Sequence, residues 1–451
     1  MPKQCTHCSG QQGDGENKGD CPLLIAAYVL AGLAMMLNIR LSYSSAPYAL
    51  IRFQLPENLF SVFVRRMASS LELWCLPSMA LGNIWDVYYK KIIYVGTGGD
   101  FNPPKPEDRT SKFKWIIVPS IISQWLNFLT YVILLVVYLM GGDYGHLTTF
   151  YFVIAISGFV FGINMVLLYS VDFYYIPVYI VGENSFPALT SFIHYVSTLI
   201  FGNRRKWNSD FLLVGIDIVV AIIISFVAAM VWSIGYGHFA GNNISTGDLK
   251  HVHAFGFSGS LNPEATSPFL MIVVGMGLVY SIYPGIAPGM IVPFYLIDKI
   301  EMVLLIATIF PPVIVAALRR SFSTWGDIRS PMCKWASDSL GQGSGIFWHA
   351  FDLLMVIKIF LAAIFIYCLH YRESAISHSI INQPKMSTFL SIIFYMCHEC
   401  LLALGFPGMV GANLGGDLVL IPQYIGALFM IFLAFYSEGY LIEYKIHYLH
   451  H

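Results

Sequence analysis

The chain has 451 residues and a formal net charge of −1 at pH 7, and 57% of its residues are hydrophobic while only 11% are charged. Its mean hydropathy is +0.66. Soluble proteins carry about 25% charged residues, so this composition excludes a water-soluble fold and indicates a protein of the lipid bilayer.

Long apolar runs recur along the whole chain. A transmembrane helix needs roughly 20 apolar residues, because the hydrocarbon core of a bilayer is about 30 Å thick. The clear runs are Cys21–Ile39, Trp115–Met140, Thr148–Val171, Phe211–Trp232, Phe269–Ser281 with its extension, Pro288–Ala317, Ile346–His370, Met386–Phe406 and Leu418–Ser437. Two weaker runs, Ala68–Tyr88 and Phe186–Phe201, lie where a further crossing keeps the loops short. Such continuous runs are not typical of a β-barrel, so we predict an all-α, polytopic membrane protein with about 11 transmembrane helices.

Polar segments divide these runs. Residues 1–20 form a polar N-terminal tail, and the run that follows is longer than the apolar region of a signal peptide, so we expect a retained first helix. Residues 237–266 are rich in Gly, Ser and Asn, which indicates a flexible connecting loop. We therefore predict a six-helix bundle over 21–236 and a five-helix bundle over 267–451.

The distribution of Lys and Arg predicts the orientation. Cytoplasmic loops of membrane proteins carry more Lys and Arg than the loops on the other side. The basic segments Lys90–Lys114 and Arg319–Lys334 both follow even-numbered spans. They favour a cytoplasmic N-terminus in an integral, multi-pass protein, and leave open whether it occupies the plasma membrane or an organelle membrane.

Metal ligation is not expected. Cys5–Cys8 and Cys397–Cys400 both have the CxxC spacing. A structural zinc site needs four ligands, and the tail offers three nearby. We predict no metal site and no cofactor.

The sequence lacks the motifs of two kinds of membrane enzyme. An intramembrane aspartyl protease needs a GxGD segment, and the segments around Asp143 and Asp417 have Met140 and Leu414 in place of the first glycine. A metal hydrolase needs a HExxH motif, and His398-Glu399 is not followed by a histidine at that spacing. We therefore expect no enzymatic activity.

Helix-breaking residues cluster in the segment Val279–Pro293, VYSIYPGIAPGMIVP. A broken helix is tolerated at membrane depth only where the freed backbone groups face protein or a water-filled cavity, and broken helices often line the path of a transported solute. The alternative for Pro284–Pro288 is a loop between two helices.

Ionisable residues inside the runs give a second argument. A charge at the bilayer centre costs roughly 2.5–3.5 kcal/mol on insertion scales, so it usually faces the interior of the bundle or a cavity. The residues of this kind are Asp217, Asp298, Lys299, Glu301, Asp352, Lys358, His194, His398 and Glu399. Asp298 and Glu301 share one helix face, where Asp298 is the candidate contact for the solute, and Glu301 carries a coupling proton or pairs with Lys358.

Several segments resemble the equilibrative nucleoside transporters. Phe161–Asn164, FGIN, and the following IPVYIVGENSF resemble the fourth and fifth spans, with Gly182 in place of a family glycine. Tyr283–Gly285, YPG, is similar to the turn of the seventh span, Asp298 to the aspartate of the eighth, and QYIGALFMIFLAFYSEGYLI to the eleventh. The aromatic-rich chain is also similar to expanded membrane-protein families of piroplasm parasites.

This resemblance implies eleven spans in a 6+5 arrangement like that of the major facilitators. It adds Asn164 and Asn38 to Asp298 and Glu301 as substrate-binding residues, and it marks Pro284, Gly285 and Gly182 as hinge or helix-break positions. The chain departs from the family pattern at Met302, where an arginine is usual, and before Asn38, where a tryptophan is usual.

We therefore predict a transporter that moves a small polar solute, a nucleoside or nucleobase, by alternating access. The alternatives are another major-facilitator-like carrier and a non-transporting structural or receptor protein. The expected partners are the solute and the lipid bilayer, with no nucleic acid, and the oligomeric state is open.

Overall fold

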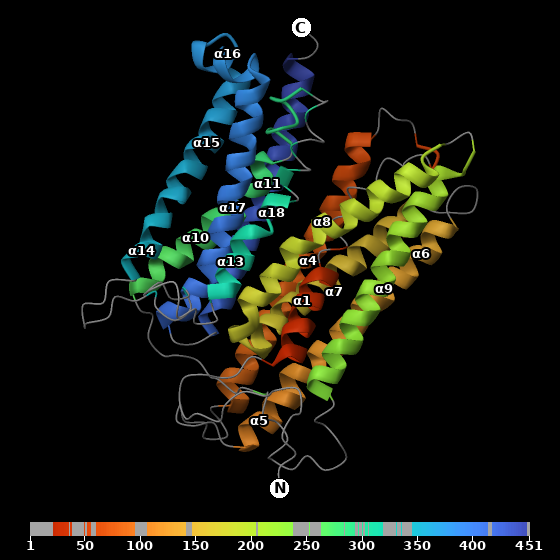
Figure 1. Cartoon of the computed structure of the whole chain (residues 1–451), viewed down its shortest axis with the longest axis vertical. Coiled ribbons are helices and arrows are strands. Elements are labelled where there is room, and N and C mark those ends of the chain that lie inside the picture. Colours follow the sequence, from red (N-terminus) through yellow and green to blue (C-terminus); the bar gives the residue numbers. More distant parts are fainter. Residues whose placement is uncertain are drawn as a thin grey trace. The chain divides into compact units, whose positions relative to one another are not determined.

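The computed structural model of the chain describes residues 21–35, 37, 49, 52–55, 60–94, 106–140, 147–203, 206–237, 252, 263–283, 285–293, 296, 300, 303–304, 306–318, 331, 335, 345–413 and 417–448. All regular elements over these residues are helices. The chain divides into two compact units, Met1–Phe257 (unit 1) and Ser258–His451 (unit 2). Figure 1 shows the helices of each unit.

Unit 1 contains the long helices of the first half of the chain. They are α1 (Pro22–Met35), α4 (Phe60–Tyr88) with the π-helical η2 (Tyr89–Tyr94), α5 (Pro106–Lys112) with the π-helical η3 (Phe113–Ile117), α6 (Val118–Leu139), α7 (Leu147–Val171), η4 (Phe173–Tyr175), α8 (Ile176–Phe201) and α9 (Ser209–Gly237). The two weaker apolar runs are helical, because α4 contains Ala68–Tyr88 and α8 contains Phe186–Phe201.

Unit 2 contains η5 (Pro263–Ala265), α10 (Thr266–Gly277), α11 (Val279–Ile282), α13 (Phe310–Leu318), α14 (Gly345–His349), η6 (Ala350–Asp352), α15 (Leu353–His370), α16 (Ala375–Ile381), α17 (Pro384–Asn413), η7 (Asp417–Val419) and α18 (Leu420–Tyr448). The predicted span Pro288–Ala317 is wrong at its beginning, where residues 288–291 form turns instead of helix. Pro288 and Pro293 lack the backbone N–H that a helix needs, and Gly289 disfavours one.

Seven helical segments of the described residues are long and apolar enough to cross a membrane. They are Arg109–Leu139, Leu147–Val171, Phe211–Gly237, Pro263–Ile282, Phe347–His370, Pro384–Ala412 and Leu420–Tyr444. The prediction of an all-α, multi-pass membrane protein is therefore confirmed. The count of about 11 spans and the 6+5 arrangement stay predictions.

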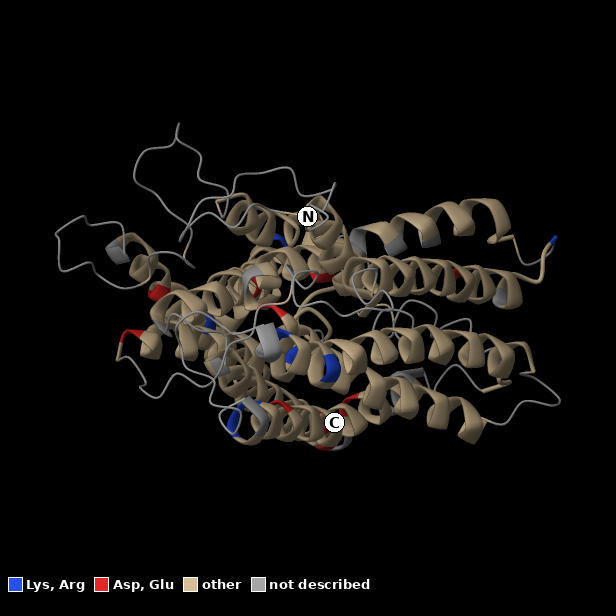
Figure 2. Ribbon diagram, turned by 90° about the horizontal axis from the view of Figure 1, so that it is seen from below, with Lys and Arg blue, Asp and Glu red and all other residues tan. Residues whose placement is uncertain are grey.

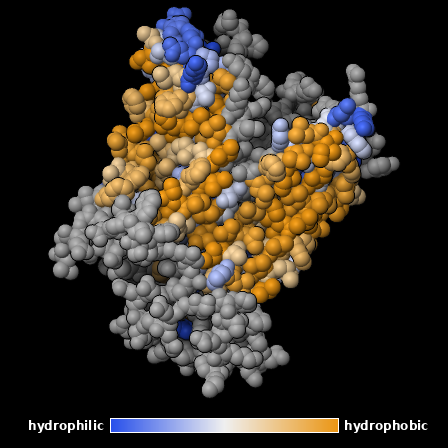
Figure 3. Space-filling model, viewed as in Figure 1, coloured by the Kyte–Doolittle hydropathy of each residue, from blue (hydrophilic) through white to orange (hydrophobic). Residues whose placement is uncertain are grey.

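The outer surface of the helices is apolar. Figure 3 shows hydrophobic side chains over the helices on the face in view, and Figure 2 shows that Lys, Arg, Asp and Glu are sparse along them. Phe152 of α7, Ile223 of α9 and Val356 of α15 are all more than half exposed. Exposure of large apolar side chains on this scale fits contact with lipid rather than water.

Helix α6 shows how this surface arises from the sequence. Its exposed positions Ile122, Leu126, Leu129, Ile133 and Val136 recur every three or four residues and are all apolar. Its buried positions recur with the same spacing and include Ser120, Ser123, Gln124, Asn127, Thr130 and Tyr131. The 3.6-residue period therefore turns the polar stripe of α6 to the interior of unit 1.

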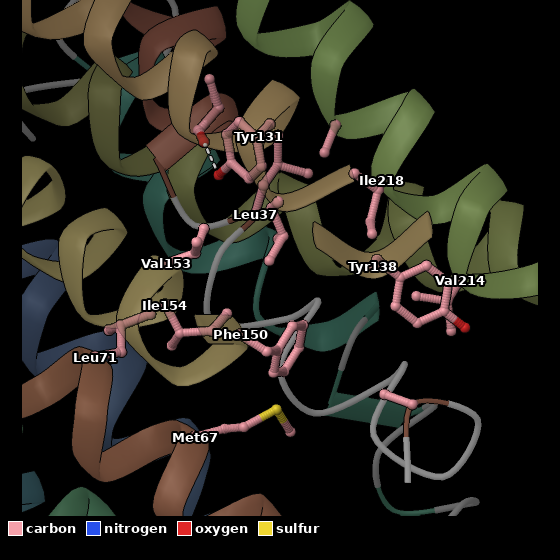
Figure 4. Close-up of a cluster of buried hydrophobic side chains, with 14 of the residues drawn as sticks. Leu37, Met67, Leu71, Tyr131, Tyr138, Phe150, Val153, Ile154, Val214 and Ile218 are labelled. Carbon is pink, nitrogen blue, oxygen red and sulfur yellow. Dashed lines mark hydrogen bonds between the residues drawn. The ribbon is translucent and has the colours of Figure 1, made fainter. Parts of the chain in front are cut away.

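The apolar part of that interior is formed by α4, α6, α7 and α9. Tyr131, Phe150, Val153, Val214 and other buried side chains make one cluster, in which Tyr131 donates a hydrogen bond to the carbonyl of Ala34 at 3.1 Å (Figure 4).

Helices α1 and α8 approach each other closely at two glycines. A Cβ atom added at Gly182 would overlap the backbone carbonyl oxygen of Val29, and one added at Gly32 would overlap that of Tyr179. Small residues at a helix crossing let two backbones come this close, a common device in membrane proteins. Helix α8 runs through Gly182 without interruption, so the structure gives Gly182 a packing role where the sequence predicted a hinge or helix break.

Replacing Gly182 with alanine is expected to destabilise unit 1 by about 1–3 kcal/mol, because the added methyl group meets backbone that cannot rotate away. The free energy of unfolding of the purified protein in detergent measures this. Gly215→Ala in α9 is the matched control, since a Cβ at Gly215 has no atom within 4 Å and alanine favours helix. Equal stabilities of the two variants would contradict the close crossing.

Candidate functional site

The candidate site in unit 2 begins where the seventh predicted span is interrupted. Helix α10 ends at Gly277, α11 ends at Ile282, and Tyr283 has extended backbone angles (φ −97°, ψ 139°). Residues 285–291 then form turns, with short-range bonds such as the one from the Ile286 amide to the Ile282 carbonyl at 2.8 Å. The described residues thus leave the helix directly before the predicted break at Pro284 and Gly285.

Side chains bond to the backbone carbonyls around this interruption. The last four carbonyls of a helix lack intrahelical partners, and lipid supplies none. Ser437 of α18 donates to the Ser281 carbonyl at 2.7 Å, and Ser281 donates to the Leu278 carbonyl at 2.9 Å. Serine side chains therefore supply hydrogen bonds to carbonyl groups at the interruption.

The Gly275 carbonyl, in the last turn of α10, accepts two such bonds. Lys358 of α15 donates through Nζ, and His398 of α17 approaches through Nδ1 at 2.7 Å. A carbonyl oxygen only accepts, so the Nδ1 atom of His398 carries the hydrogen. Three helices that are distant in the sequence are joined at one oxygen, and positive charge at the C-terminal end of a helix is favoured by the helix dipole.

Lys358 is fully buried in the middle of the apolar segment Phe347–His370. Its Nζ lies 5.2 Å from the centre of the Phe394 ring, a cation–π distance. Over the described residues, no carboxylate lies within ion-pair distance of Nζ, although Glu399 of α17 interacts with Lys358 electrostatically. The predicted pairing of Lys358 with Glu301 stays a prediction, because Glu301 lies outside the described residues.

A row of ring contacts runs from the interruption at Tyr283 to His398, which shares the Gly275 carbonyl with Lys358. The Tyr283 and Tyr395 rings are 4.7 Å apart, and the Tyr395 and His398 rings are 5.4 Å apart. The buried Ile300 and Leu304 belong to a cluster that also includes Tyr283 and Tyr395. The described part of the eighth predicted span therefore packs beside the same site.

Asn164 lies in a separate polar cluster within unit 1. It is fully buried in α7, its Oδ1 accepts from Ser123 of α6 at 2.7 Å, and its Nδ2 donates to the sulfur of Met35 of α1 at 2.8 Å. The structure thus gives Asn164 side-chain partners on two helices. The other predicted contact residues, Asn38, Asp298 and Glu301, and the predicted break residue Pro284 lie outside the described residues.

Sequence reasoning missed two features that carry a recognisable signal. Asp86 of α4 and Lys90 of η2 form a buried ion pair at 2.6 Å, and their i, i+4 spacing is the usual one for such a pair. The stripe from Ser120 to Thr130 repeats polar residues with helical spacing inside an apolar run, but it contains no charged residue. In the described part of the chain, no three His, Cys, Asp or Glu side chains gather as metal ligands.

Comparison with known proteins gives no family. No protein-family model matches the chain, and no curated protein matches it. Among solved structures, it is similar to a bacterial homologue of the iron transporter ferroportin, crystallised in an outward-facing state with soaked iron. The sequence identity is 10%, the TM-score is 0.41, and the match covers 94% of this chain and 99% of the other. A likeness this low carries no argument about function, and no comparison supports the nucleoside-transporter family in particular.

The shared carbonyl predicts a coupling between Lys358 and His398. Either Lys358→Met or His398→Phe leaves one side-chain donor on the Gly275 oxygen, whereas the double variant removes both. We expect the double variant to lose about 1–3 kcal/mol more unfolding free energy than the two single losses together, because a buried carbonyl is then deprived of its side-chain partners. Unfolding in mixed detergent micelles measures this, and losses that simply add would contradict the shared bond.

Proposed function

We propose that the protein is a membrane transporter that moves a small polar solute. The observation that carries the proposal is Lys358, a fully buried ionisable side chain in a membrane span that donates to the Gly275 carbonyl and lies beside the Phe394 ring. A charge within the bilayer costs several kcal/mol, and charges of this kind mark solute, ion or proton pathways in membrane proteins. Its position beside an interrupted helix adds support, because such interruptions form solute sites in many transporters.

Alternating access is the proposed mode of movement. It requires two bodies that can change their relative arrangement while each keeps its own packing. The division of the chain into two compact units supports this requirement. In the proposed cycle, each unit moves as a body, and the turn segment after Tyr283 accommodates local changes in unit 2.

A nucleoside or nucleobase is the proposed solute. The support is the resemblance of Phe161–Asn164 and Tyr283–Gly285 to the equilibrative nucleoside transporters, together with the uncharged hydrogen-bonding groups around Asn164. Asp298, Asn164, Asn38 and Glu301 are the proposed contacts. A carrier for another polar solute and a non-transporting structural or receptor protein are the competing functions.

Uptake of radiolabelled purine nucleosides and nucleobases, in cells that lack their own uptake, tests this function. We expect saturable uptake by the native chain and its loss in Asp298→Asn, because the amide replaces one of the two accepting carboxylate oxygens with an NH2 donor and removes the negative charge. The exposed Glu373 in the turn after α15 provides the matched control, and Glu373→Gln is expected to keep full uptake.

Both variants must reach the membrane in equal amounts, which surface labelling verifies. Normal uptake by Asp298→Asn would remove Asp298 from the site. Absence of uptake of every compound by the native chain would reject the proposed solute class and favour one of the competing functions.

A further inference from the structure

The exposed apolar face of α4 leads to a lysine at the end of the helix. This face is made of large side chains with helical spacing, Leu81, Ile84, Trp85 and Tyr88, and each is more than a third exposed. Lys91 of η2 is exposed and follows Tyr88 by three residues, so it continues the same face. The face that fits contact with lipid is therefore apolar up to Tyr88 and reaches a charged residue at Lys91.

Helix α6 has the same arrangement at its beginning. Val118, Ile122 and Leu126 are exposed at intervals of four residues. Lys114 of η3 lies four residues before Val118 and is exposed as well. The end of α4 and the beginning of α6 are connected through α5, which Figure 1 shows at one end of unit 1. Each of the two apolar faces therefore ends in one lysine at this end.

Aromatic side chains hold these two helix ends together. Trp85 donates through Nε1 to the Trp115 carbonyl at 2.8 Å, and the two rings are 5.4 Å apart. The Tyr88 ring lies 6.3 Å from the Trp115 ring. Lys114 directly precedes Trp115, and Lys91 is one turn beyond Tyr88, so both lysines lie next to these rings. Trp and Tyr are enriched where the hydrocarbon meets the lipid headgroups, and the position of this cluster fits that boundary.

The connecting elements carry more positive than negative charge. Lys90 of η2 forms the buried ion pair with Asp86 at 2.6 Å. Helix α5 contains two acidic and two basic residues, Glu107, Asp108, Arg109 and Lys112. Lys91 and Lys114 account for the two positive charges left over, and both are exposed beside the apolar faces. This surface therefore combines attraction for an anion with contact area for an acyl chain.

We propose that Lys91 and Lys114 bind the headgroup of an anionic phospholipid, whose acyl chains lie along the exposed faces of α4 and α6. Such a ligand needs no cavity, because it lies against the outside of the helices. Charge complementarity selects its headgroup, and the sequence predicts this side to be cytoplasmic, where anionic lipids are concentrated. The site goes beyond the proposed function and does not depend on which solute is moved.

Native mass spectrometry of the full-length protein, released from detergent micelles, tests the site. The lipids are phosphatidylserine and phosphatidylcholine with identical acyl chains. We expect the native chain to bind phosphatidylserine at least about tenfold more tightly than phosphatidylcholine. Lys91→Met and Lys114→Met should each weaken phosphatidylserine binding about fivefold and leave phosphatidylcholine binding unchanged, because methionine keeps an unbranched apolar side chain without the charge.

Lys206→Met is the matched control. Lys206 is also an exposed lysine beside an exposed tryptophan, since its Nζ lies 5.7 Å from the centre of the Trp207 ring, but it belongs to the connection between α8 and α9. Its substitution should change phosphatidylserine affinity by less than about twofold. Melting temperatures in phosphatidylcholine nanodiscs verify that the variants are folded. Phosphatidylserine in the nanodiscs should raise the melting temperature of the native chain and of Lys206→Met, but not that of the double variant Lys91→Met/Lys114→Met.

Equal affinity of the native chain for the two lipids would overturn the site, as would native phosphatidylserine affinity in the double variant. An equal loss in Lys206→Met would also overturn it, because any surface lysine would then suffice. Glycerophosphoserine, the soluble headgroup without acyl chains, separates a lipid site from a site for a free phosphate group. We expect it to leave the melting temperature unchanged, and a rise as large as the one with phosphatidylserine would reject a lipid as the ligand.

Discussion

Every backbone N–H and C=O group inside a bilayer must find its hydrogen bond within the protein, and this constraint accounts for most of the structure. It explains why the described elements are helices, whose backbone bonds are internal. It also explains why hydroxyls within the helices bond back to their own backbone, as Ser120 does to the Ile117 carbonyl and Thr130 to the backbone carbonyl of Asn127. Where a helix stops, as α10 does at Gly277, side chains from other helices must donate hydrogen bonds to the carbonyl groups that the helix leaves without a donor.

The Gly275 carbonyl shows the consequence most clearly. The end of α10 would leave this oxygen short of partners in an environment without water, and Lys358 and His398 both reach it from other helices. The Gly275 oxygen gains hydrogen-bond donors, and the buried Lys358 side chain gains the negative end of the α10 dipole. An interrupted helix and a buried cation are therefore one feature of unit 2.

The two units meet the same constraint with different chemistry. In unit 1 the interior polar stripe of α6 is neutral, and Asn164 is held between a hydroxyl and a thioether. In unit 2 the described polar centre contains a cation and an imidazole. Packing alone does not require polar side chains inside the two units, since replacing buried charged groups by apolar side chains of similar size often leaves stability unchanged or raises it. Under the proposed function, the polar groups at depth serve the solute.

The sequence by itself determined the membrane class, the location of most helices and the interruption near Tyr283, because run length, composition and the chemistry of Pro and Gly are local properties. The roles of individual residues within the helices could not be predicted from the sequence in the same way. Gly182 looked like a break and is a close crossing, because its role depends on Val29 of another helix. Lys358 was recognised as buried charge, but its partner is 83 residues away and His398 is 123 residues from the same oxygen. Which polar side chains share a partner follows only from the way distant helices pack, since a sequence records spacing along one helix and not the distance between two.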